Sequence, residues 1–549
     1  MRTLIALAAS LATFLVPPAF AQQDAAMQRP AARAAGEGAG PYAKLVIRGA
    51  TIIEGSGAPP YGPADIVIEG NRITDIRIAG TPGKPLAVDR LPRDATHEID
   101  ATGMFVMPGF VDTHGHNGNA AKAPDASYGY KLWLAHGVTS VRGVSFYGDP
   151  ARSIEDRRRS AANEIAAPRL FAYQVLGQGW DGGRIDDPDR ARAWVRWAAA
   201  QGLDGIKIFN RGDETPDVIE ATIDEANKLG LGTVAHLSQP GVHSVNARVA
   251  GGWGLGTVTH FYGHFESLLA GKSLQPTPPD YNFLDEQHRF GEIAEIWDDI
   301  SEPGGAEWQA YLAEQKANGL VFDPTFNIYS ASRDLMRARN ADWHQRYTLP
   351  TMWDFFQSNR ENHGSYFFDW TTAREVAWRN FYARYMRLVN DYKNMGGRVT
   401  VGSDPGFIYQ IWGFGYILEM EMLQEAGFLP LEVIRAATID GARTLYDPKG
   451  KAPPFGLVRR GMLADLVIVP ENPLQNFKTL YGTGTQRLNA ETDRLETVGG
   501  VRWTVKDGIV YDAPRLLEDV AAMVARDKAA RAASAGPLPG NEVAEAARR

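Results

Sequence analysis

Histidines recur in this sequence at the ends of short apolar runs. His114 and His116 lie two residues apart in the segment P-G-F-V-D-T-H-G-H, and in an extended chain residues at this spacing point to the same side. His236 ends the run T-V-A-H, and His260 ends the run T-V-T-H. Neutral imidazole is a common ligand of transition metals. Because four of the eleven histidines stand at such ends, the sequence predicts a metal site.

A purely structural role for some of these histidines stays open at this point. Two hydrogen-bonded structural histidines would also give an H-x-H pattern, and His243 and His264 are nearby alternatives as ligands. We favour His260 over His264 because His260 follows its β-rich run directly, whereas His264 comes after Gly263 in loop-like sequence.

An aspartate and a lysine complete the candidate residues. Asp404 lies in V-G-S-D-P-G, where a carboxylate suits a metal ligand or a general base, although Ser-Asp-Pro-Gly is also good turn sequence. Lys207 lies in D-G-I-K-I-F, and a charged side chain within such a buried-looking β run is unusual. We expect this lysine to be paired with an acid or chemically altered.

The elements that must position these residues are β-rich runs that alternate with helical stretches. This alternation predicts βαβ units and a parallel sheet, and eight runs suit a closed (β/α)₈ barrel of the TIM type. The active site of such a barrel lies at the carboxyl ends of its strands, where the candidate residues occur. The runs cover residues 105–111, 139–144, 169–173, 205–209, 233–236, 257–260, 320–322 and 398–402.

Short β-rich segments also flank the barrel, which we place at residues 109–446. Residues 44–108 and 447–515 predict a small composite β-sandwich domain built from both flanks. Two crossovers exceed the about 30 residues of an ordinary βα unit, which indicates insertions at about 265–318 and 327–396. The aromatic-rich second insertion suits a lid or substrate wall, and equally a helical subdomain with its own core or an oligomer contact.

The two ends of the chain have distinct compositions. Residues 1–21 carry Arg2, an apolar run and a small-x-small site, as in a secretory signal peptide, so we expect a mature start at Gln22 and a periplasmic or secreted protein. Residues 22–43 are typical of a flexible lead-in, and residues 516–549 of a helix with a frayed tail. The sequence predicts no membrane anchor, because no stretch reaches the about 20 apolar residues that a spanning helix needs.

The overall composition narrows the class of protein and the kind of metal site. The chain has 549 residues, a formal net charge of −8 and no basic stripe, which argues against nucleic acid as a partner. It contains no cysteine, which excludes disulfides, thiolate ligands and a cysteine nucleophile. Any metal must therefore be held by histidine, carboxylate or modified lysine.

Taken together, the motifs resemble the amidohydrolase superfamily, in particular its imidazolonepropionase and prolidase-like branch. The resemblance covers about residues 44–517. It rests on P-G-F-V-D-T-H-G-H at the first barrel strand, D-G-I-K-I-F at the fourth, V-A-H and T-V-T-H at the fifth and sixth, and V-G-S-D-P-G at the eighth.

The resemblance implies two divalent metal ions, with Zn²⁺ as the default. By similarity, His114 and His116 would hold the more buried metal, and His236 and His260 the more exposed one. Lys207, carboxylated by CO₂, would bridge the two metals, because a carbamate offers two anionic oxygens where an ammonium offers none. Asp404 would bind the buried metal and accept a proton from the bridging hydroxide.

These residues predict a hydrolase that cleaves an amide bond in a small molecule, such as a dipeptide or an N-acyl amino acid. Opening of a cyclic amide or a lactone is an alternative with the same site, and a non-catalytic metal-containing binding protein is another. Arg142, Arg211 and Tyr262 are candidates for contacting substrate, and each could equally have a purely structural role. Substrate identity and oligomeric state stay open.

Overall fold

The structure, a computed structural model, describes residues 27–210, 214–269, 282, 285–360 and 363–534. The predicted signal segment and the predicted mature start at Gln22 therefore lie outside the described residues, as does Arg211. None of the helices in the described part of the chain is long and apolar enough to cross a membrane.

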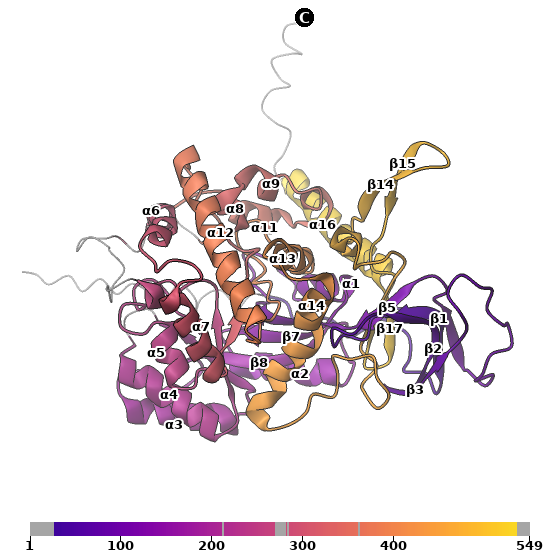
Figure 1. The fold of residues 1–549 in the computed structure, drawn as a ribbon, viewed down its shortest axis with the longest axis horizontal. Coiled ribbons are helices and arrows are strands. Elements are labelled where there is room, and N and C mark those ends of the chain that lie inside the picture. Colours follow the sequence, from indigo (N-terminus) through magenta and orange to yellow (C-terminus); the bar gives the residue numbers. More distant parts are fainter. Residues whose placement is uncertain (1–26, 211–213, 270–281, 283–284, 361–362, 535–549) are drawn as a thin grey trace, which may run out of the picture.

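The larger part of the molecule contains a sheet of seven parallel strands with helices around it (Figure 1). Its strands follow one another in chain order, and each is joined to the next by a crossover that contains at least one helix or a long loop. They are β6 (Phe110–Gly115), β7 (Val138–Val144), β8 (Arg169–Val175), β9 (Gly205–Phe209), β10 (Gly232–His236), β11 (Thr257–Thr259) and β12 (Val321–Asp323).

The predicted eighth strand, residues 398–402, closes this sheet without forming a regular strand. On one side Thr400 N donates to Phe322 O at 3.0 Å, and Val399 forms one isolated parallel bridge with Phe322. On the other side Thr113 N donates to Val401 O at 3.0 Å. The chain then bends at Asp404, whose φ is 44°. The predicted α/β barrel fold is thus confirmed, with its last strand reduced to a bridging segment.

The second sheet draws its strands from both flanks of the barrel, as predicted for the smaller domain (Figure 1). Its order is β17-β16-β13-β5-β1-β2-β3, and β4 pairs with the first half of β1. β14 and β15 form a separate hairpin. The bounds are β1 (Leu45–Ile52), β2 (Tyr61–Glu69), β3 (Arg72–Ile78), β4 (His97–Asp100), β5 (Phe105–Pro108), β13 (Leu466–Val469), β14 (Thr485–Asn489), β15 (Arg494–Val498), β16 (Trp503–Lys506) and β17 (Ile509–Asp512).

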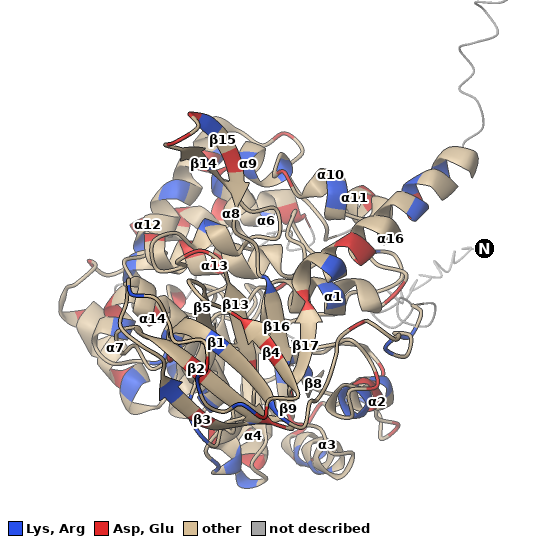
Figure 2. Cartoon of the chain, turned by 90° about the vertical axis from the view of Figure 1, so that its right-hand side faces the viewer, with Lys and Arg blue, Asp and Glu red and all other residues tan. Residues whose placement is uncertain are grey.

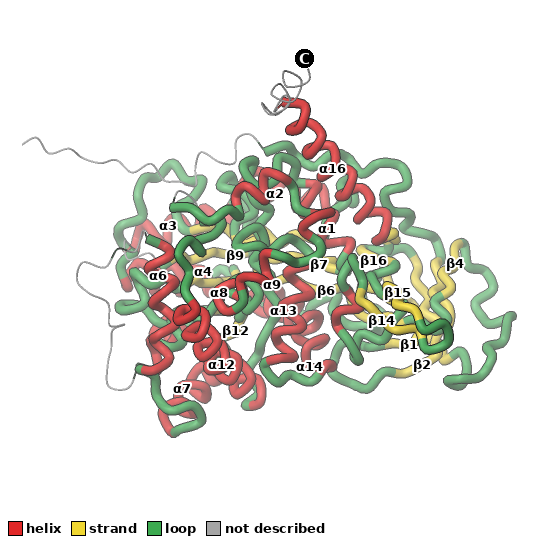
Figure 3. The backbone as a smooth tube through the Cα atoms, turned by 90° about the horizontal axis from the view of Figure 1, so that it is seen from above, coloured by secondary structure: helices red, strands yellow, loops and turns green. Residues whose placement is uncertain are grey.

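Helices surround the barrel strands, and the second sheet lies at one end of the molecule (Figure 3). Asp149 and Asp187 begin two of the helices by accepting bonds from backbone N–H groups, each followed by a proline at the first helical position. The helices of the first five crossovers are α1 (Ser127–Ala135), α2 (Pro150–Ala161), α3 (Pro188–Ala200), α4 (Pro216–Lys228) and α5 (Ala247–Gly252).

The two long crossovers are largely helical. The first contains α6 (Glu286–Ile293) and α7 (Ala306–Ala317). The second contains α8 (Ser330–Arg333), α9 (Leu335–Arg339), α10 (His344–Tyr347), α11 (Pro350–Phe355) and α12 (Thr372–Asn394). The remaining helices are α13 (Phe414–Glu425), α14 (Pro430–Arg435), α15 (Gly441–Tyr446) and α16 (Ala513–Ser534).

Acidic and basic residues are interspersed along the second sheet and the helices in the view of Figure 2. Many of them form surface ion pairs, such as Arg158 with Glu155 at 2.9 Å and Lys228 with Asp224 at 2.6 Å. Pairs of this kind contribute little to stability, because water screens both charges.

Candidate metal centre

Six side chains predicted as metal ligands meet at the carboxyl ends of the barrel strands. They come from β6, β9 and β10 and from the residues that follow β6, β11 and the bridging segment 398–402. All six line one pocket of about 170 Å³. They are His114, His116, Lys207, His236, His260 and Asp404.

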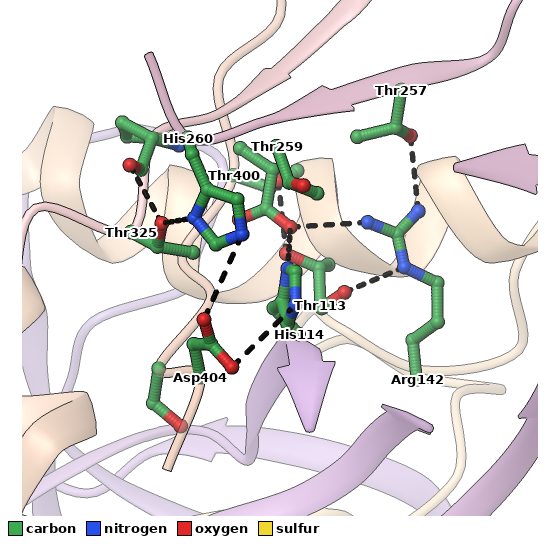
Figure 4. Close-up of polar contacts among 12 residues, drawn as sticks. Thr113, His114, Arg142, Thr257, Thr259, His260, Thr325, Thr400 and Asp404 are labelled. Carbon is green, nitrogen blue, oxygen red and sulfur yellow. Dashed lines mark hydrogen bonds and ion pairs between the residues drawn. The ribbon is translucent and has the colours of Figure 1, made fainter. Parts of the chain in front are cut away.

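The carboxylate of Asp404 lies at the centre of this group. Its Oδ1 is 3.3 Å from His116 Nε2 and 3.7 Å from His114 Nε2, and its Oδ2 is 3.7 Å from His260 Nε2. Figure 4 shows Asp404 pointing toward both His114 and His260. The His236 ring completes the cluster, with its centroid 4.6 Å from that of His260. One ligand atom each from His114, His116 and Asp404 can be chosen so that all lie within 4.8 Å of one another.

Lys207 is fully buried beside these groups. Its Nζ has no hydrogen-bond partner among the residues that the structure describes and lies 4.9 Å from the centroid of the Phe209 ring. Burial lowers the pKa of Lys207 to about 7, so a large fraction of the amine is neutral near neutral pH. An amine without a partner beside four imidazoles and a carboxylate fits a site that is completed by metal ions and a modified lysine.

The protonation states of the cluster also suit metal binding. Burial tends to raise the pKa of Asp404, but the neighbouring imidazoles of His114 and His116 hold it well below its ordinary value. Burial, with the charge of Lys207, holds the pKa of His114 well below its ordinary value. An ionised carboxylate and neutral imidazoles are the forms that bind metals.

Several residues that carry the cluster have unusual backbone angles. His260 has a φ of 64°, Asp404 of 44°, Ser145 of 75° and Thr325 of 46°, all in the left-handed region that non-glycine residues rarely adopt. His260 is held there by a 2.5 Å bond between its Nδ1 and Thr325 Oγ1, and Asp404 by its N–H, which donates to His114 O at 2.8 Å. Strain of this kind concentrates at functional sites, where it directs side chains inward.

Asp112, below the cluster, connects the first strand to the last loop. It is fully buried and accepts bonds from His114 N and Ser403 N, both at 3.0 Å, and from Trp133 Nε1 at 2.9 Å. It therefore fixes the segments that carry His114 and Asp404 relative to each other. Its place in the D-T-H-G-H motif was a usable sequence signal.

The residues predicted to contact substrate are placed differently. Arg142 does not line the pocket, and its prediction as a substrate contact is corrected: its guanidinium lies inside the barrel and donates to Thr113 O, Thr257 Oγ1 and Asp323 Oδ2. Tyr262 is buried behind the pocket, with its ring centroid 4.9 Å from that of His236. Arg211 lies outside the described residues.

The alternative histidines are not in the cluster. His264 is buried and bonded through Nδ1 to Tyr311 Oη at 2.7 Å, with its ring 4.3 Å from that of Phe322. His243 is exposed. Neither side chain lines the pocket that contains the four predicted histidine ligands.

The second insertion supplies a wall of the pocket that sequence reasoning did not identify residue by residue. Tyr329 and His363 line the pocket, and His363 Nδ1 pairs with Glu286 at the start of α6, in the other insertion. Farther out, α12 buries Phe381 against Phe261, with ring centroids 4.8 Å apart. The second insertion thus contributes side chains both to the pocket wall and to aromatic packing beside it.

Asp323, at the end of β12, was also missed. It is fully buried, and its Oδ2 lies 3.7 Å from His114 Nδ1. Its position after a short apolar run is the same signal that identified His236 and His260, and it could have been found in that way.

Comparison with known proteins gives sequence matches over parts of the chain. No protein-family model matches it. A 5-methylthioadenosine/S-adenosylhomocysteine deaminase from Symbiobacterium thermophilum is 28% identical over 262 residues, which are 40% of this chain and 54% of that one. An N-acyl-D-aspartate deacylase from Alcaligenes xylosoxydans xylosoxydans is 34% identical over 136 residues, 24% of each chain. The chain thus spans about half or less of the length of these curated relatives.

Solved structures give a match to the whole fold. A Xaa-Pro dipeptidase with bound methionine in its active site aligns with a TM-score of 0.54 and 20% identity, covering 85% of this chain and 100% of that one. An identity this low shows the fold alone. Together with the sequence matches and the motifs at the strand ends, it supports the assignment of the chain to the amidohydrolase superfamily.

Proposed function

We propose that the protein is a metal-dependent amidohydrolase that cleaves an amide C–N bond of a small molecule, such as a dipeptide or an N-acyl amino acid. The observation that carries this proposal is the convergence of four histidines, a lysine and an aspartate in one pocket. Two of the similar proteins, a deacylase and a dipeptidase, are named for hydrolysis of such bonds.

Two divalent metal ions, by default Zn²⁺, would be shared among these side chains. His114 and His116 would hold one metal and His236 and His260 the other, with a carboxylated Lys207 between them. The carbamate forms when the neutral amine attacks CO₂ and releases one proton, and the lowered pKa of Lys207 favours that neutral form. When bound, such metals activate water as a nucleophile and polarise the scissile carbonyl.

Asp404 is the proton-handling residue in this proposal. Its carboxylate is ionised, buried and directed into the pocket among three imidazoles. A carboxylate in this place can accept a proton from the attacking water and deliver it to the leaving amine, and such general acid–base catalysis contributes about 10²- to 10⁴-fold.

Hydrogen-bond donors on the pocket wall favour a substrate rich in acceptors. Gln178 Oε1 accepts a bond from Gln174 Nε2 at 2.8 Å, which leaves the Gln178 amide N–H₂ as a donor. His363 engages Glu286 through Nδ1, which leaves Nε2 for the substrate. Lys122 adds a positive charge, with Nζ 3.2 Å from the centroid of the Phe407 ring. Carboxylate and carbonyl groups of a dipeptide or an N-acyl amino acid match this wall.

A turnover screen tests the proposal. Purified, zinc-supplemented protein is assayed against dipeptides, N-acyl amino acids, lactams and lactones. Asp404→Asn serves as the inactive control and Asp224→Asn, on the outer side of α4, as the matched active control. Hydrolysis of a linear amide that Asp404→Asn abolishes supports the proposal. Turnover of lactams or lactones alone redirects it to ring opening, and metal-loaded protein that hydrolyses none of them supports a binding role instead.

We also propose export of the protein to the periplasm or the medium. The support is the composition of residues 1–21, with one positive charge, an apolar run and a small-x-small site.

A further inference from the structure

A buried ion pair lies directly beneath the metal centre. Arg142 on β7 is 1% exposed and Asp323 at the end of β12 is fully buried, and Arg142 Nη2 lies 3.1 Å from Asp323 Oδ2. Burying two charges is costly, so a pair in this place points to a role beyond stability.

Arg142 is fixed at three points of the barrel. Nε donates to Thr113 O at 2.6 Å and Nη1 donates to Thr257 Oγ1 at 3.0 Å (Figure 4). Nη2 donates to Asp323 Oδ2 at 3.1 Å. Thr113 immediately precedes His114. The guanidinium therefore positions both the segment that carries His114 and the carboxylate that faces it.

The His114 ring lies between two carboxylates. Its Nε2 faces Asp404 Oδ1 at 3.7 Å, and its Nδ1 faces Asp323 Oδ2, also at 3.7 Å. Nδ1 is buried and has no hydrogen-bond partner among the described residues, and Asp323 Oδ1 also has none. The gap on the Nδ1 side exceeds an ordinary N–H···O distance by about 0.7 Å.

Gly402 makes room for this arrangement. A side-chain carbon at residue 402 would lie 2.3 Å from Asp323 Oδ1 and 2.7 Å from His114 Cβ. Only glycine allows the backbone of the closing segment to pass this close to both residues. The closing segment, His114 and Asp323 are thus packed as one unit.

We propose that Asp323 is a positioning residue of the metal centre. Its carboxylate, oriented by Arg142, accepts a hydrogen bond from Nδ1–H of His114 and so leaves Nε2 as the nitrogen that binds metal. Carboxylates that orient ligating histidines in this way typically affect metal affinity 10- to 100-fold, an order-of-magnitude range. The inference rests on the metal centre of the proposed function.

The test measures Co²⁺ binding by competition with a chromophoric chelator, so it needs no substrate. In the variant Arg142→Met/Asp323→Leu, apolar groups of similar volume replace the pair, an exchange that proteins often tolerate. The matched control is Arg169→Met/Asp465→Leu, a second ion pair, with a buried carboxylate and a half-buried guanidinium, that lies between β8 and the second sheet and does not line the pocket. We expect Co²⁺ affinity to fall about 10- to 100-fold at one of two sites in the first variant and to stay within about threefold in the control.

Asp323→Asn keeps an acceptor oxygen, and we expect it to recover part of the lost affinity. Folded Arg142→Met/Asp323→Leu protein with wild-type Co²⁺ affinity would overturn the inference, whereas failure of the wild type to bind Co²⁺ would instead overturn the metal centre itself.

A neutron structure of the wild type tests the same point without any variant. A deuterium on His114 Nδ1 directed at Asp323 supports the inference, and a deuterium on Nε2 with Nδ1 bare refutes it.

Discussion

The substitution Lys207→Met keeps an unbranched side chain, one heavy atom shorter, and removes the amine. In metal-free protein we expect it to stabilise the fold, although it should abolish binding of the second metal. The reason is that the wild type buries an amine that has no hydrogen-bond partner among the described residues. Such a group serves the site at the expense of stability.

The size of this effect follows from the pKa of Lys207. Burial lowers it from an ordinary 10.5 to about 7. At a pH between these two pKa values, Lys207 is protonated in the unfolded chain and neutral in the folded chain. Releasing this proton on folding lowers the free energy of unfolding by about 1.4 kcal/mol for each pH unit below 10.5. The cost is about 4 kcal/mol at pH 7.5 and about 1 kcal/mol at pH 9.5. The free energy of unfolding of the wild type should therefore rise with pH across this window, as far as Lys207 determines it.

Urea unfolding of chelator-treated wild type and Lys207→Met at pH 7.5 and 9.5 measures the difference. The variant should be more stable by an amount on the order of 4 kcal/mol at the lower pH, and the gain should shrink at the higher pH. The exposed Lys228→Met, on α4, serves as a control with little effect at either pH. A variant less stable than wild type at pH 7.5, or a gain that does not depend on pH, would refute this reasoning.

Three further outcomes are expected. Asp404→Asn should lower kcat by on the order of 10² or more while most of the metal stays bound, and near-wild-type turnover with full metal content would place the base elsewhere. Burial raises the pKa of the Glu266 carboxyl from 4.5 to about 7, so ionisation of this group destabilises the folded protein as pH rises through that window. Glu266→Gln should therefore stabilise the protein by about 3 kcal/mol at pH 8 and little at pH 4.5. Equal urea midpoints of variant and wild type at pH 8 would contradict this. Protein exported by a Gram-negative host should begin at Gln22 on N-terminal sequencing, and a membrane-retained chain that keeps residues 1–21 would argue against export.

The barrel could be predicted because its strands are short, apolar and separated by helical stretches. The runs that include Lys207, His236 and His260 match β9, β10 and β11 closely. The closing segment 398–402 was harder, because a strand and a single parallel bridge have the same local sequence. Only the neighbouring strands show that the segment makes one bridge and a few separate backbone bonds instead of a regular ladder.

The candidate ligands could be found because each stands where a strand ends, a position that local sequence reveals. The side of the strand to which the Arg142 side chain points could not be predicted in this way. Every residue of β7 is buried, so there is no alternation between exposed and buried positions to indicate a side. Its partner Asp323 lies 181 residues away, and no local pattern connects the two.

The outer wall of the pocket was unpredictable for a similar reason. His363 follows no strand, and its pairing with Glu286 joins two separate insertions. Sequence indicated that the second insertion was aromatic and suited to a wall or a core. Which of its side chains reach the pocket depends on how the two insertions pack together.

Anomalous diffraction from zinc-loaded crystals would decide whether the six converging groups hold two metals. We expect two anomalous peaks, one beside His114 and His116 and the other beside His236 and His260. Continuous density should extend from Lys207 Nζ to a carboxylate between the peaks. A single peak, peaks away from these residues, or density that ends at the bare amine of Lys207 in an active, metal-loaded preparation would contradict the two-metal site.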